Sequence, residues 1–446
     1  MKILRNILIV TVALFSATVV TWASEPLDRS VKKSAQAPAS ELCVKLEALP
    51  GVVSVDKVGT ERFLERYRVK ITQPVDHKDP SKGTFTQRFY VSHAGFDRPT
   101  LMVAEGYAAK YGEVARHREE ISDRFNTNQI IVEHRYFDES TPDPCDWTYM
   151  TGEQEAADLH AINTLMRTIY PGKWISTGIS KGGQNTMIYR AFYPDDVDFS
   201  VPYVGPVCFD VEDGRHEPFI SDIGDDDHKA KTRALQREVL ERRAVMTPML
   251  EAFIADKGYD ASVLSPDSLL DFCVLEYPFA LNQWGTEVMD VDENTTDEEL
   301  FAHLMKVAGP DYFVVPSTTP FFVQAARELG YYGYDTSYLQ DLLVVKDTRG
   351  YLHDLFLPED AKDIEFDDTL HLLIYRFLKD NDPKMLFVYG ETDPWTAAAP
   401  EDYLFYNKKN MHKFVQPGGS HSTRINTMPE EQRERAWTIL QSWLDE

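Results

Sequence analysis

The sequence predicts an α/β fold in which a core built on a parallel sheet is interrupted by a large helical insertion. Three observations lead to this fold class. The segment 173–183 has the pattern of a strand, a sharp turn and the start of a helix. Apolar, strand-like runs lie on both sides of it, whereas residues 210–377 show mainly helical periodicity with acidic loops. Strand and helix patterns then resume, so the insertion divides a single core.

The first residues predict a secretory signal peptide. Basic residues open the chain, an apolar run spans 7–20, and small residues follow at 21–23. We therefore expect residues 1–23 to be removed and the mature protein to be exported to the periplasm or the extracellular space. The apolar run is short for a membrane span, and no later stretch is long and apolar enough for one. We expect no membrane partner once the signal is removed.

The elements of the core are predicted in chain order. Residues 24–60 are expected to form an N-terminal lead, and the core comprises residues 61–209 and 378–446, with the helical cap, 210–377, between them. Apolar or alternating runs indicate strands, and amphipathic stretches indicate helices. The expected strands are 67–72, 85–91, 99–104, 129–132, 173–179, 200–204, 385–389 and 412–416, and the expected core helices are 153–169 and 429–444.

Composition limits the classes of partner. The 446 residues carry a formal net charge of −26, which argues against nucleic acid and anionic membranes as partners. The four cysteines, in an exported chain, predict at least one disulfide, with four buried free thiols as the alternative. The sequence has no C-x-x-C, no H-E-x-x-H and no His/Cys cluster, so we predict neither a metal nor a cofactor.

The turn at residues 178–182, Gly-Ile-Ser-Lys-Gly, has the pattern of a nucleophile elbow. In such an elbow the serine lies on a strained turn that lifts its Oγ above the sheet. Glycines two residues before and after it let the strand and the helix approach closely. The pattern predicts an α/β-hydrolase core with Ser180 as the nucleophile. A serine that only caps the helix is the alternative.

The partners of Ser180 are expected later in the chain, the acid first and the histidine last. Asp393 follows the predicted strand 385–389, in a turn with Pro394. Only two histidines lie beyond it: His412 begins the stretch 412–416, and His421 lies in the loop that follows. Because the catalytic edge of a parallel sheet is at the carboxyl ends of its strands, we predict His421 rather than His412 as the base.

Several segments resemble known peptidase families. Residues 133–140, Glu-His-Arg-Tyr-Phe-Asp-Glu-Ser, resemble a segment of family S28, the prolylcarboxypeptidase and dipeptidyl-peptidase 7 group, as do 104–106 and 393–395. Residues 177–183 with 193–198, and 275–280 with 283–285, resemble more closely the neighbouring family S37 of secreted bacterial tripeptidyl aminopeptidases. Asp138 and Lys181 depart from the S28 pattern, which has glycine and tyrosine at these positions.

The resemblance implies an exported serine exopeptidase that removes short, tripeptide-sized fragments from free peptide N-termini through an acyl-enzyme. It implies the same triad of Ser180, Asp393 and His421. The oxyanion hole is expected to use the backbone N–H of Lys181 and one from Gly106 or Tyr107.

An exopeptidase of this kind has to bind the free ammonium group of its peptide substrate with a carboxylate. Glu105 and Glu133 both follow predicted strands at the catalytic edge. Glu105 is favoured by the resemblance, whereas Glu133 has the alternative of an internal ion pair with Arg135. Among the aromatic residues of the cap, Tyr277 and Trp284 are the candidates for substrate contacts.

Two other functions compete with the peptidase. An esterase or acyltransferase uses the same fold and triad, because a fold alone does not determine the substrate. A non-catalytic exported binding protein retains the fold without the chemistry. The order of serine, aspartate and histidine argues against the binding protein, and the peptidase-like segments argue against the esterase.

Overall fold

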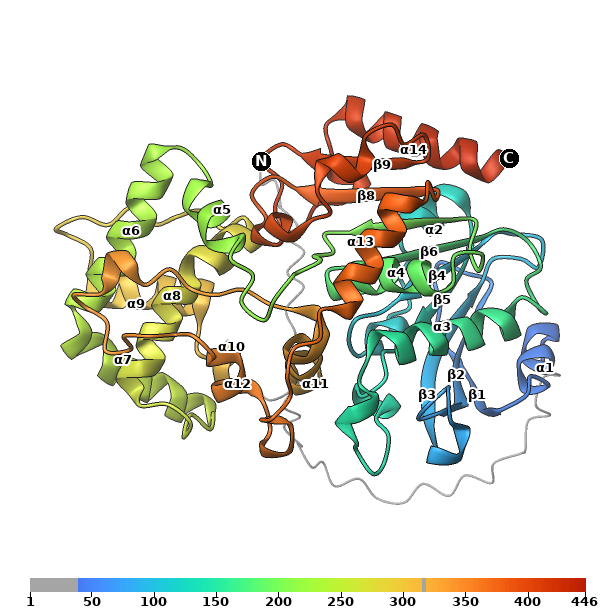
Figure 1. The fold of residues 1–446 in the computed structure, drawn as a ribbon, viewed down its shortest axis with the longest axis horizontal. Helices are drawn as coiled ribbons and strands as arrows, with labels where there is room; N and C mark the ends of the chain where they lie inside the picture. Colours follow the sequence, from blue (N-terminus) through green and yellow to red (C-terminus); the bar gives the residue numbers. More distant parts are fainter. Residues whose placement is uncertain (1–38, 315–317) are drawn as a thin grey trace, which may run out of the picture. The chain divides into compact units, whose positions relative to one another are not determined.

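A nine-stranded sheet forms the core of the computed structural model, which describes residues 39–314 and 318–446 (Figure 1). The strand order is β1-β2-β3-β5-β4-β6-β7-β8-β9. The first three strands pair antiparallel, β3 pairs antiparallel with β5, and the remaining pairs are parallel. The strands are β1 (Val52–Val58), β2 (Glu65–Pro74), β3 (Thr84–His93), β4 (Thr100–Ala104), β5 (Asn128–Val132), β6 (Trp174–Ile179), β7 (Phe199–Tyr203), β8 (Met385–Gly390) and β9 (Met411–Gln416).

Burial explains why these runs are strands. Every residue of β4, β5, β7 and β8 is buried, as expected for parallel strands that are covered by helices on both faces. In β2, buried residues mostly alternate with partly exposed ones, because this strand lies near one edge of the sheet. All the strands predicted from the sequence are present. The strand order and the elbow turn after β6 make this an α/β-hydrolase fold with a large helical insertion.

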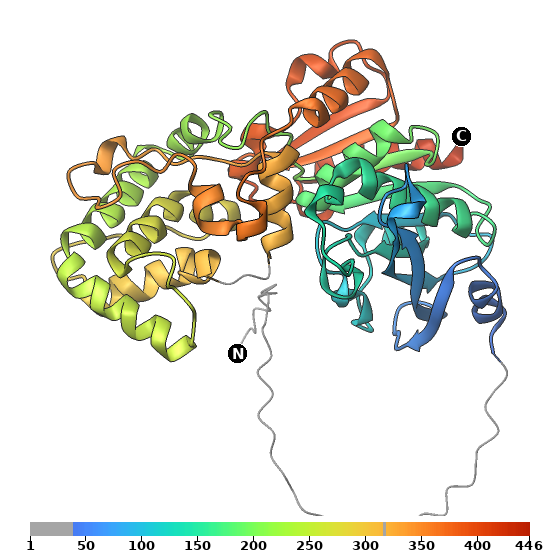
Figure 2. The same cartoon turned by 60° about the horizontal axis from the view of Figure 1, so that its bottom comes forward.

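Helices cover the two faces of the sheet through separate apolar clusters (Figures 1 and 2). One cluster includes residues of α1, α3, α4 and α13, and the other includes residues of α2 and α14. The helices are α1 (Glu41–Glu47), α2 (Glu120–Phe125), α3 (Gly152–Met166), α4 (Lys181–Phe192), α5 (His216–Asp222), α6 (Asp226–Glu241), α7 (Arg243–Lys257), α8 (Pro266–Trp284), α9 (Asp297–Ala308), α10 (Asp311–Val314), α11 (Thr319–Gln324), α12 (Tyr351–Phe356), α13 (Thr369–Asp380) and α14 (Glu430–Asp445).

The inserted helices have an apolar cluster of their own. Figure 1 shows α6 to α9 gathered on one side of the sheet. Their cluster also contains Phe137, Met150 and Trp395, which lie on loops of the core. The insertion is therefore packed against loops beyond the carboxyl ends of the strands, and it can cover an active site there.

The structure places elements of the sheet layers outside the expected core boundaries. The stretch 24–60, expected as a lead, contains α1 and β1, and β1 pairs with β2 from Val52↔Ile71 to Val58↔Arg66. Helix α13, expected within the cap, buries its apolar face in the same cluster as α3 and α4. We therefore propose that the core comprises residues 41–209 and 369–446. The signal peptide expected at 1–23 lies outside the described residues.

The expected disulfide is wrong for this structure. Cys145, Cys208 and Cys273 are free thiols, and any bridge among the four cysteines needs at least one of them. Cys208 and Cys273 are buried in the apolar cluster of the insertion, where a thiol behaves as a small hydrophobic group. Burial raises the pKa of both thiols far above the usual value, so both stay protonated.

Among the described residues, no helix combines the length and the apolar character that crossing a membrane requires.

Thiol labelling tests the cysteine arrangement. In the native protein a thiol reagent should react rapidly with exposed Cys145 and should reach Cys208 and Cys273 only after denaturation. Mass spectrometry of the labelled protein, denatured without a reductant, should count four alkylated cysteines. A count of two or fewer would show a disulfide and contradict the structure.

Candidate active site

In the turn between β6 and α4, the backbone of the strand lies in direct contact with the backbone of the helix and of the end of β4. Ser180 has φ 60° and ψ −123°, a strained conformation for a residue with a side chain. A Cβ on Gly178 would collide with the backbone of Gly182, and one on Gly182 would lie 2.7 Å from the carbonyl oxygen of Ala104. The Ser180 N–H donates to the Tyr203 carbonyl at 2.9 Å, which holds the strained turn against β7.

Asp393 and His421 meet at the same edge of the sheet. Asp393 begins the short helix η9 (Pro394–Ala398) just beyond β8, and its Oδ1 accepts from the N–H of Trp395 at 3.2 Å. Its Oδ2 lies 2.7 Å from Nδ1 of His421. Asp393 is fully buried, and His421 is 5% exposed. A carboxylate at Nδ1 favours the tautomer in which Nε2 is free to accept a proton.

The second ring nitrogen of His421, Nε2, is buried and has no hydrogen-bond partner among the described residues to match Asp393 at Nδ1. Strands β6, β7, β8 and β9 are parallel neighbours, so the segments that follow them emerge at one edge of the sheet. Ser180, Asp393 and His421 follow β6, β8 and β9 and therefore lie at this edge.

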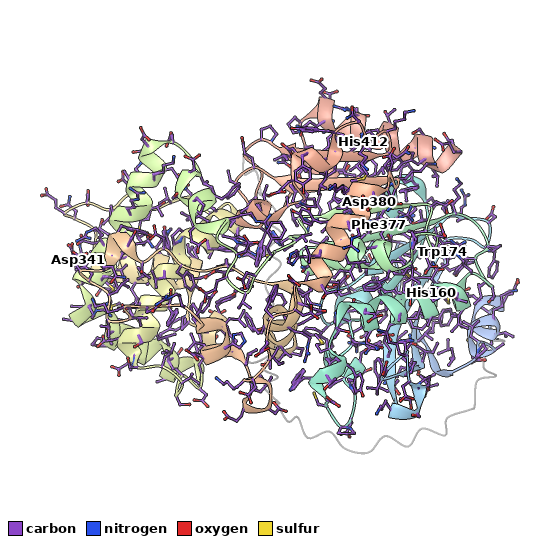
Figure 3. The ribbon with its side chains drawn as sticks, viewed as in Figure 1. His160, Trp174, Asp341, Phe377, Asp380 and His412 are labelled. Atoms are coloured by element: carbon purple, nitrogen blue, oxygen red, sulfur yellow. The ribbon has the colours of Figure 1, made fainter. Side chains whose placement is uncertain are left out.

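His412 lies toward the opposite end of β9. It is the second residue of the strand, and its ring stacks on Trp443 of α14 at 5.9 Å (Figure 3). Burial, the largest cause, lowers its pKa. The structure thus gives the two histidines different surroundings: an aspartate for His421 and an aromatic ring for His412.

The loop that carries His421 is held from two sides. The backbone N–H of His421 donates to the carbonyl of Gln283 at 2.9 Å, at the end of α8 in the insertion. The carboxylate of Glu120, on α2, accepts from the N–H groups of Ile425 at 2.9 Å and Asn426 at 3.0 Å. The position of the imidazole therefore depends on both the core and the insertion.

The expected oxyanion donors are brought together. Lys181 is the first residue of α4, where backbone N–H groups have no partner within the helix. A Cβ on Gly106 would lie 2.7 Å from Cβ of Lys181, so the loop after β4 rests directly on the start of the helix. The Gly106 N–H, however, donates to Oε1 of Glu105 at 2.9 Å. Tyr107 is the next residue of this loop.

The two expected ammonium-binding carboxylates both have protein partners. Oε2 of Glu105 accepts from the Tyr111 hydroxyl at 2.6 Å, in addition to the Gly106 bond. Burial raises the pKa of Glu105, and these hydrogen bonds oppose the rise. The geometry makes Glu105 an orienting group for its own loop.

Glu133 lies in a polar network between β3 and β5. It forms an ion pair with Arg88, and it accepts from Ser140 Oγ at 2.7 Å and from the Ala109 N–H at 2.9 Å. Its partner is therefore Arg88 and not Arg135, which instead binds Asp158 through two nitrogens. This arrangement is typical of a buried structural carboxylate.

The two expected aromatic contacts differ in position. Tyr277 is fully buried within the insertion, and its hydroxyl lies 2.9 Å from Nε2 of His303. Trp284 is 56% exposed, and its ring is edge-on to His421 with centroids 5.9 Å apart. The structure thus brings Trp284 to the site, whereas Tyr277 packs against another helix of the insertion.

Sequence reasoning missed an aromatic row that links the oxyanion loop to the acid turn. The ring of Tyr107 lies 5.7 Å from Phe321, Phe321 lies 5.6 Å from Tyr331, and Tyr331 lies 5.5 Å from Trp395. The four residues lie in four separate loops or helices, so the sequence alone does not bring them together. Tyr331 and Trp395 are buried in this row, whereas Tyr107 and Phe321 are partly exposed.

A cavity of about 80 Å³ in the insertion was also missed. Its lining includes Glu217, Phe279 and Asn282. Phe279 packs on Trp395 at 5.2 Å, and Asn282 precedes Gln283, the partner of His421. Oε2 of Glu217 is buried without a hydrogen-bond partner, and burial and nearby carboxylates raise its pKa. The charged form of such a buried, unpartnered carboxylate is stabilised when a cation binds beside it.

Within residues 39–314 and 318–446, no group of three or more histidine, cysteine, aspartate or glutamate side chains is arranged to hold a metal ion.

The chain is similar in sequence to known peptidases. A family model described as PS-10 peptidase S37 matches residues 35–445. The chain is 29% identical over 434 residues to prolyl tri/tetrapeptidyl aminopeptidase of Streptomyces mobaraensis, covering 92% of this chain and 86% of the relative.

Solved structures include two distant matches. A peroxisomal α/β-hydrolase from Saccharomyces cerevisiae has 12% identity and a TM-score of 0.40, covering 86% of this chain and 89% of the other. A proline iminopeptidase from Mycobacterium smegmatis has 13% identity and a TM-score of 0.37, covering 84% and 98%.

The contact between Gly106 and α4 can be tested without an activity assay. Gly106→Ala should lower the free energy of unfolding by about 1–3 kcal/mol, because the added methyl group overlaps Lys181 and Gly182. Gly172→Ala is the matched control, since its Cβ would meet only the Arg98 carbonyl, at an ordinary 3.7 Å. Denaturant unfolding measures both, and equal stabilities would contradict the close packing.

Proposed function

The chain belongs to peptidase family S37, and from this premise we propose that it is an exported serine exopeptidase that removes short, tripeptide-sized fragments from the free N-termini of peptides. The family and the name of the relative make the chain a serine aminopeptidase on an α/β-hydrolase fold. The observation that carries the proposed mechanism is the 2.7 Å contact between Asp393 and His421, at the sheet edge where the strained Ser180 turn lies.

The two ring nitrogens of His421 have different roles in the proposed reaction. Nε2 takes the proton of Ser180 as Oγ attacks the peptide carbonyl, while Asp393 holds the Nδ1 proton and stabilises the imidazolium. The C–N bond then breaks, and the same proton passes to the leaving amine. Water, deprotonated by His421, attacks the resulting ester, releases the N-terminal fragment as an acid and restores Ser180.

The negative oxygen of each tetrahedral intermediate requires donors that are already in place. We propose the N–H of Lys181 together with one from the loop after β4. Gly106 and Tyr107 were both expected there. The Gly106 N–H donates to Glu105 at 2.9 Å, whereas the Tyr107 N–H acts on the same carboxylate more weakly, so we favour Tyr107. One such donor typically contributes about 3 kcal/mol to the barrier reduction.

The ammonium group of the substrate has to be bound by a carboxylate, and three glutamates are candidates for this role. Glu105 and Glu133 already have donors of their own, which weakens their case. Glu217 is supported by its unpartnered, buried oxygen and by a cavity wall that packs on the residues flanking Asp393 and His421. We propose Glu217 as the group that binds the free N-terminus.

The aromatic row supports an apolar residue on the acyl side of the cleaved bond. Tyr107 and Phe321 are the partly exposed rings of this row, and buried Tyr331 and Trp395 support them. We propose that the exposed rings contact a ring-shaped side chain. The relative from Streptomyces mobaraensis is named for prolyl substrates, and proline is the residue that we propose here. Trp284, beside His421, is placed to contact the peptide as well.

Export stays a proposal that rests on the signal pattern of residues 1–23. Mass spectrometry of the exported protein should find the mature N-terminus near Ser24. The competing esterase or acyltransferase shares the triad, and only the substrate separates it from a peptidase.

The role of Glu217 and the peptidase activity itself are tested together by a two-by-two assay. Glu217→Gln should lower kcat/KM about 30-fold or more for a free tripeptide chromogen, because a buried ammonium would lose its counter-charge. The same variant should act like the unaltered enzyme on the N-acetylated tripeptide, which has no ammonium to bind.

The variants Glu105→Gln and Glu133→Gln are assayed together with Glu217→Gln on the same two substrates. Equal losses on both substrates would remove Glu217 from the amine site. Efficient cleavage of the acetylated peptide by the unaltered enzyme would remove the aminopeptidase mechanism, and activity only on a nitrophenyl ester would favour the esterase.

Histidine substitutions separate the proposed base from its neighbour. His421→Ala should reduce turnover by several orders of magnitude, as should Ser180→Ala, whereas His412→Ala should retain most activity because its ring faces Trp443. Labelling by a fluorophosphonate, read by peptide mass spectrometry, should be lost in Ser180→Ala and kept in the control Ser422→Ala. Labelling that persists without Ser180, or inactivation by His412→Ala alone, would contradict the triad.

A further inference from the structure

The side chain of Lys181 is a buried charge with no direct partner. The residue is 2% exposed, and its Nζ has no hydrogen-bond partner among the described residues. The residue follows the proposed nucleophile directly. Lysine is almost never fully buried without a partner, because removing its ammonium from water costs several kcal/mol. The mechanism so far uses only its backbone N–H and leaves this side chain without a role.

The ammonium lies among groups from several elements. The rings of Tyr107 and Phe137 have centroids 6.0 and 5.7 Å from Nζ, a range in which a cation is attracted to an aromatic face. Three buried carboxylates also act on it, in decreasing order those of Glu155, Glu105 and Glu328.

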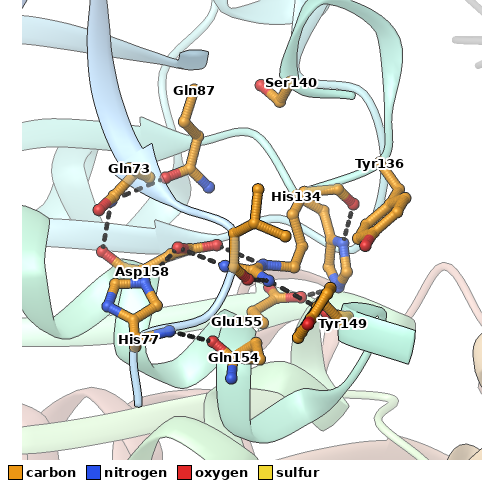
Figure 4. Close-up of polar contacts among 12 residues, drawn as sticks. Gln73, His77, Gln87, His134, Tyr136, Ser140, Tyr149, Gln154, Glu155 and Asp158 are labelled. Atoms are coloured by element: carbon orange, nitrogen blue, oxygen red, sulfur yellow. Dashed lines mark hydrogen bonds and ion pairs between the residues drawn. The ribbon is translucent and has the colours of Figure 1, made fainter. Parts of the chain in front are cut away.

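These carboxylates are themselves fixed in place. Glu155, on α3, contacts the ring of His134, and both residues lie in the polar network of Figure 4. Burial lowers the pKa of His134 well below its usual value, so this imidazole is neutral. Glu328, on the short helix η6 (Ala325–Leu329), accepts from the Gly152 N–H at the start of α3. Glu105 accepts from its own loop at Gly106. The ammonium of Lys181, at the start of α4, is therefore attracted to carboxylates on helix α3, on the insertion and on the loop after β4.

We propose that the Lys181 side chain is a positioning residue for the oxyanion hole. Its charge, attracted to the Tyr107 ring and to the Glu105 carboxylate, draws the loop after β4 onto the first turn of α4. This sets the distance at which the N–H groups of Lys181 and Tyr107 converge on one oxygen. The proposal rests on the proposed function, because it assigns a role within the same site.

If Lys181 only stabilised the fold, replacing it would change the free energy of unfolding and would leave the kcat of the folded enzyme unchanged. Methionine has a similar length and fills the same space without an ammonium to desolvate, so Lys181→Met should leave the free energy of unfolding unchanged or raise it. A positioning residue instead affects the rate, because a displacement of about 1 Å in a catalytic group can cost about 100-fold. The two roles are separated by comparing kcat with stability.

The charge also gives a pH dependence. Burial lowers the pKa of Lys181 from 10.5 to about 8, while Glu155, Glu105 and Glu328 oppose the shift. Above pH 8 the ammonium loses its proton, and kcat should fall on that alkaline side. Because the folded pKa lies below the unfolded one, the unfolded chain binds more protons between about pH 8 and 10.5. Stability relative to Lys181→Met should therefore rise with pH across this window.

The experiment uses the full mature enzyme and four variants. Lys181→Met should lower kcat about 10- to 100-fold with KM nearly unchanged, and it should lose the alkaline decline. Lys181→Arg keeps its charge and should move the decline to higher pH. Glu155→Gln removes the strongest opposing charge and should move it to lower pH. Lys173→Met, whose Nζ lies 3.7 Å from Asp198 at the other end of β6, is the control and should change none of these.

The outcomes are distinguishable from failure of the proposed function. If unaltered enzyme is neither labelled by a fluorophosphonate at Ser180 nor active on peptides, the proposed function fails. If unaltered enzyme is active and Lys181→Met keeps its kcat, or loses kcat only in proportion to a loss of folded protein, the positioning role is overturned. Identical pH profiles for Lys181→Met and the unaltered enzyme would overturn it as well.

Discussion

The close approach of backbones around Ser180 is the constraint on which the rest of the site depends. Gly178, Gly182 and Gly106 each lie where a Cβ would meet neighbouring backbone or the Lys181 side chain, so strand, helix and loop touch without side chains between them. This contact forces the positive φ at Ser180 and places the free N–H groups of the helix start beside the loop after β4. The other groups of the site are arranged around that fixed point.

The helical insertion completes what the sheet begins. The core alone supplies the ends of β6, β8 and β9, but the N–H of His421 is held by the Gln283 carbonyl of the insertion. Aromatic rings from both parts pack together at Trp395, where Phe279 and Tyr331 meet the acid turn. In the proposed mechanism, substrate recognition and the alignment of the base therefore depend on the same helices.

The sequence order was enough to place Ser180, Asp393 and His421 at the ends of their strands, because apolar runs and turn residues mark strand ends directly. It was not enough to show where carboxylates point. Glu105 and Glu133 do follow buried strands, yet Glu105 turns back onto its own loop at Gly106 and Tyr111. Glu133 turns toward Arg88 and Ala109, partners that depend on the tertiary fold and leave no local pattern.

The same reason explains why the sequence did not show that β1 joins the sheet, that α13 packs on α3 and α4, or that the cysteines lie apart. Strand β1 lies at the edge of the sheet with a partly exposed, irregular burial pattern, so its sequence lacks a clear alternation. The sequence pattern of an amphipathic helix such as α13 is the same whether the helix covers a sheet or belongs to a cap. An even number of cysteines gives no information on whether any two of them come within bonding distance.

The hydrogen bond from His421 to Gln283 has a consequence for access. Any movement that lifts the end of α8 away from the core breaks this bond and releases the loop that carries the imidazole. In the proposed mechanism, such a movement would displace the base while the Glu120 bonds still held the rest of its loop. A polypeptide that held the end of α8 away from the core would therefore also slow its own cleavage.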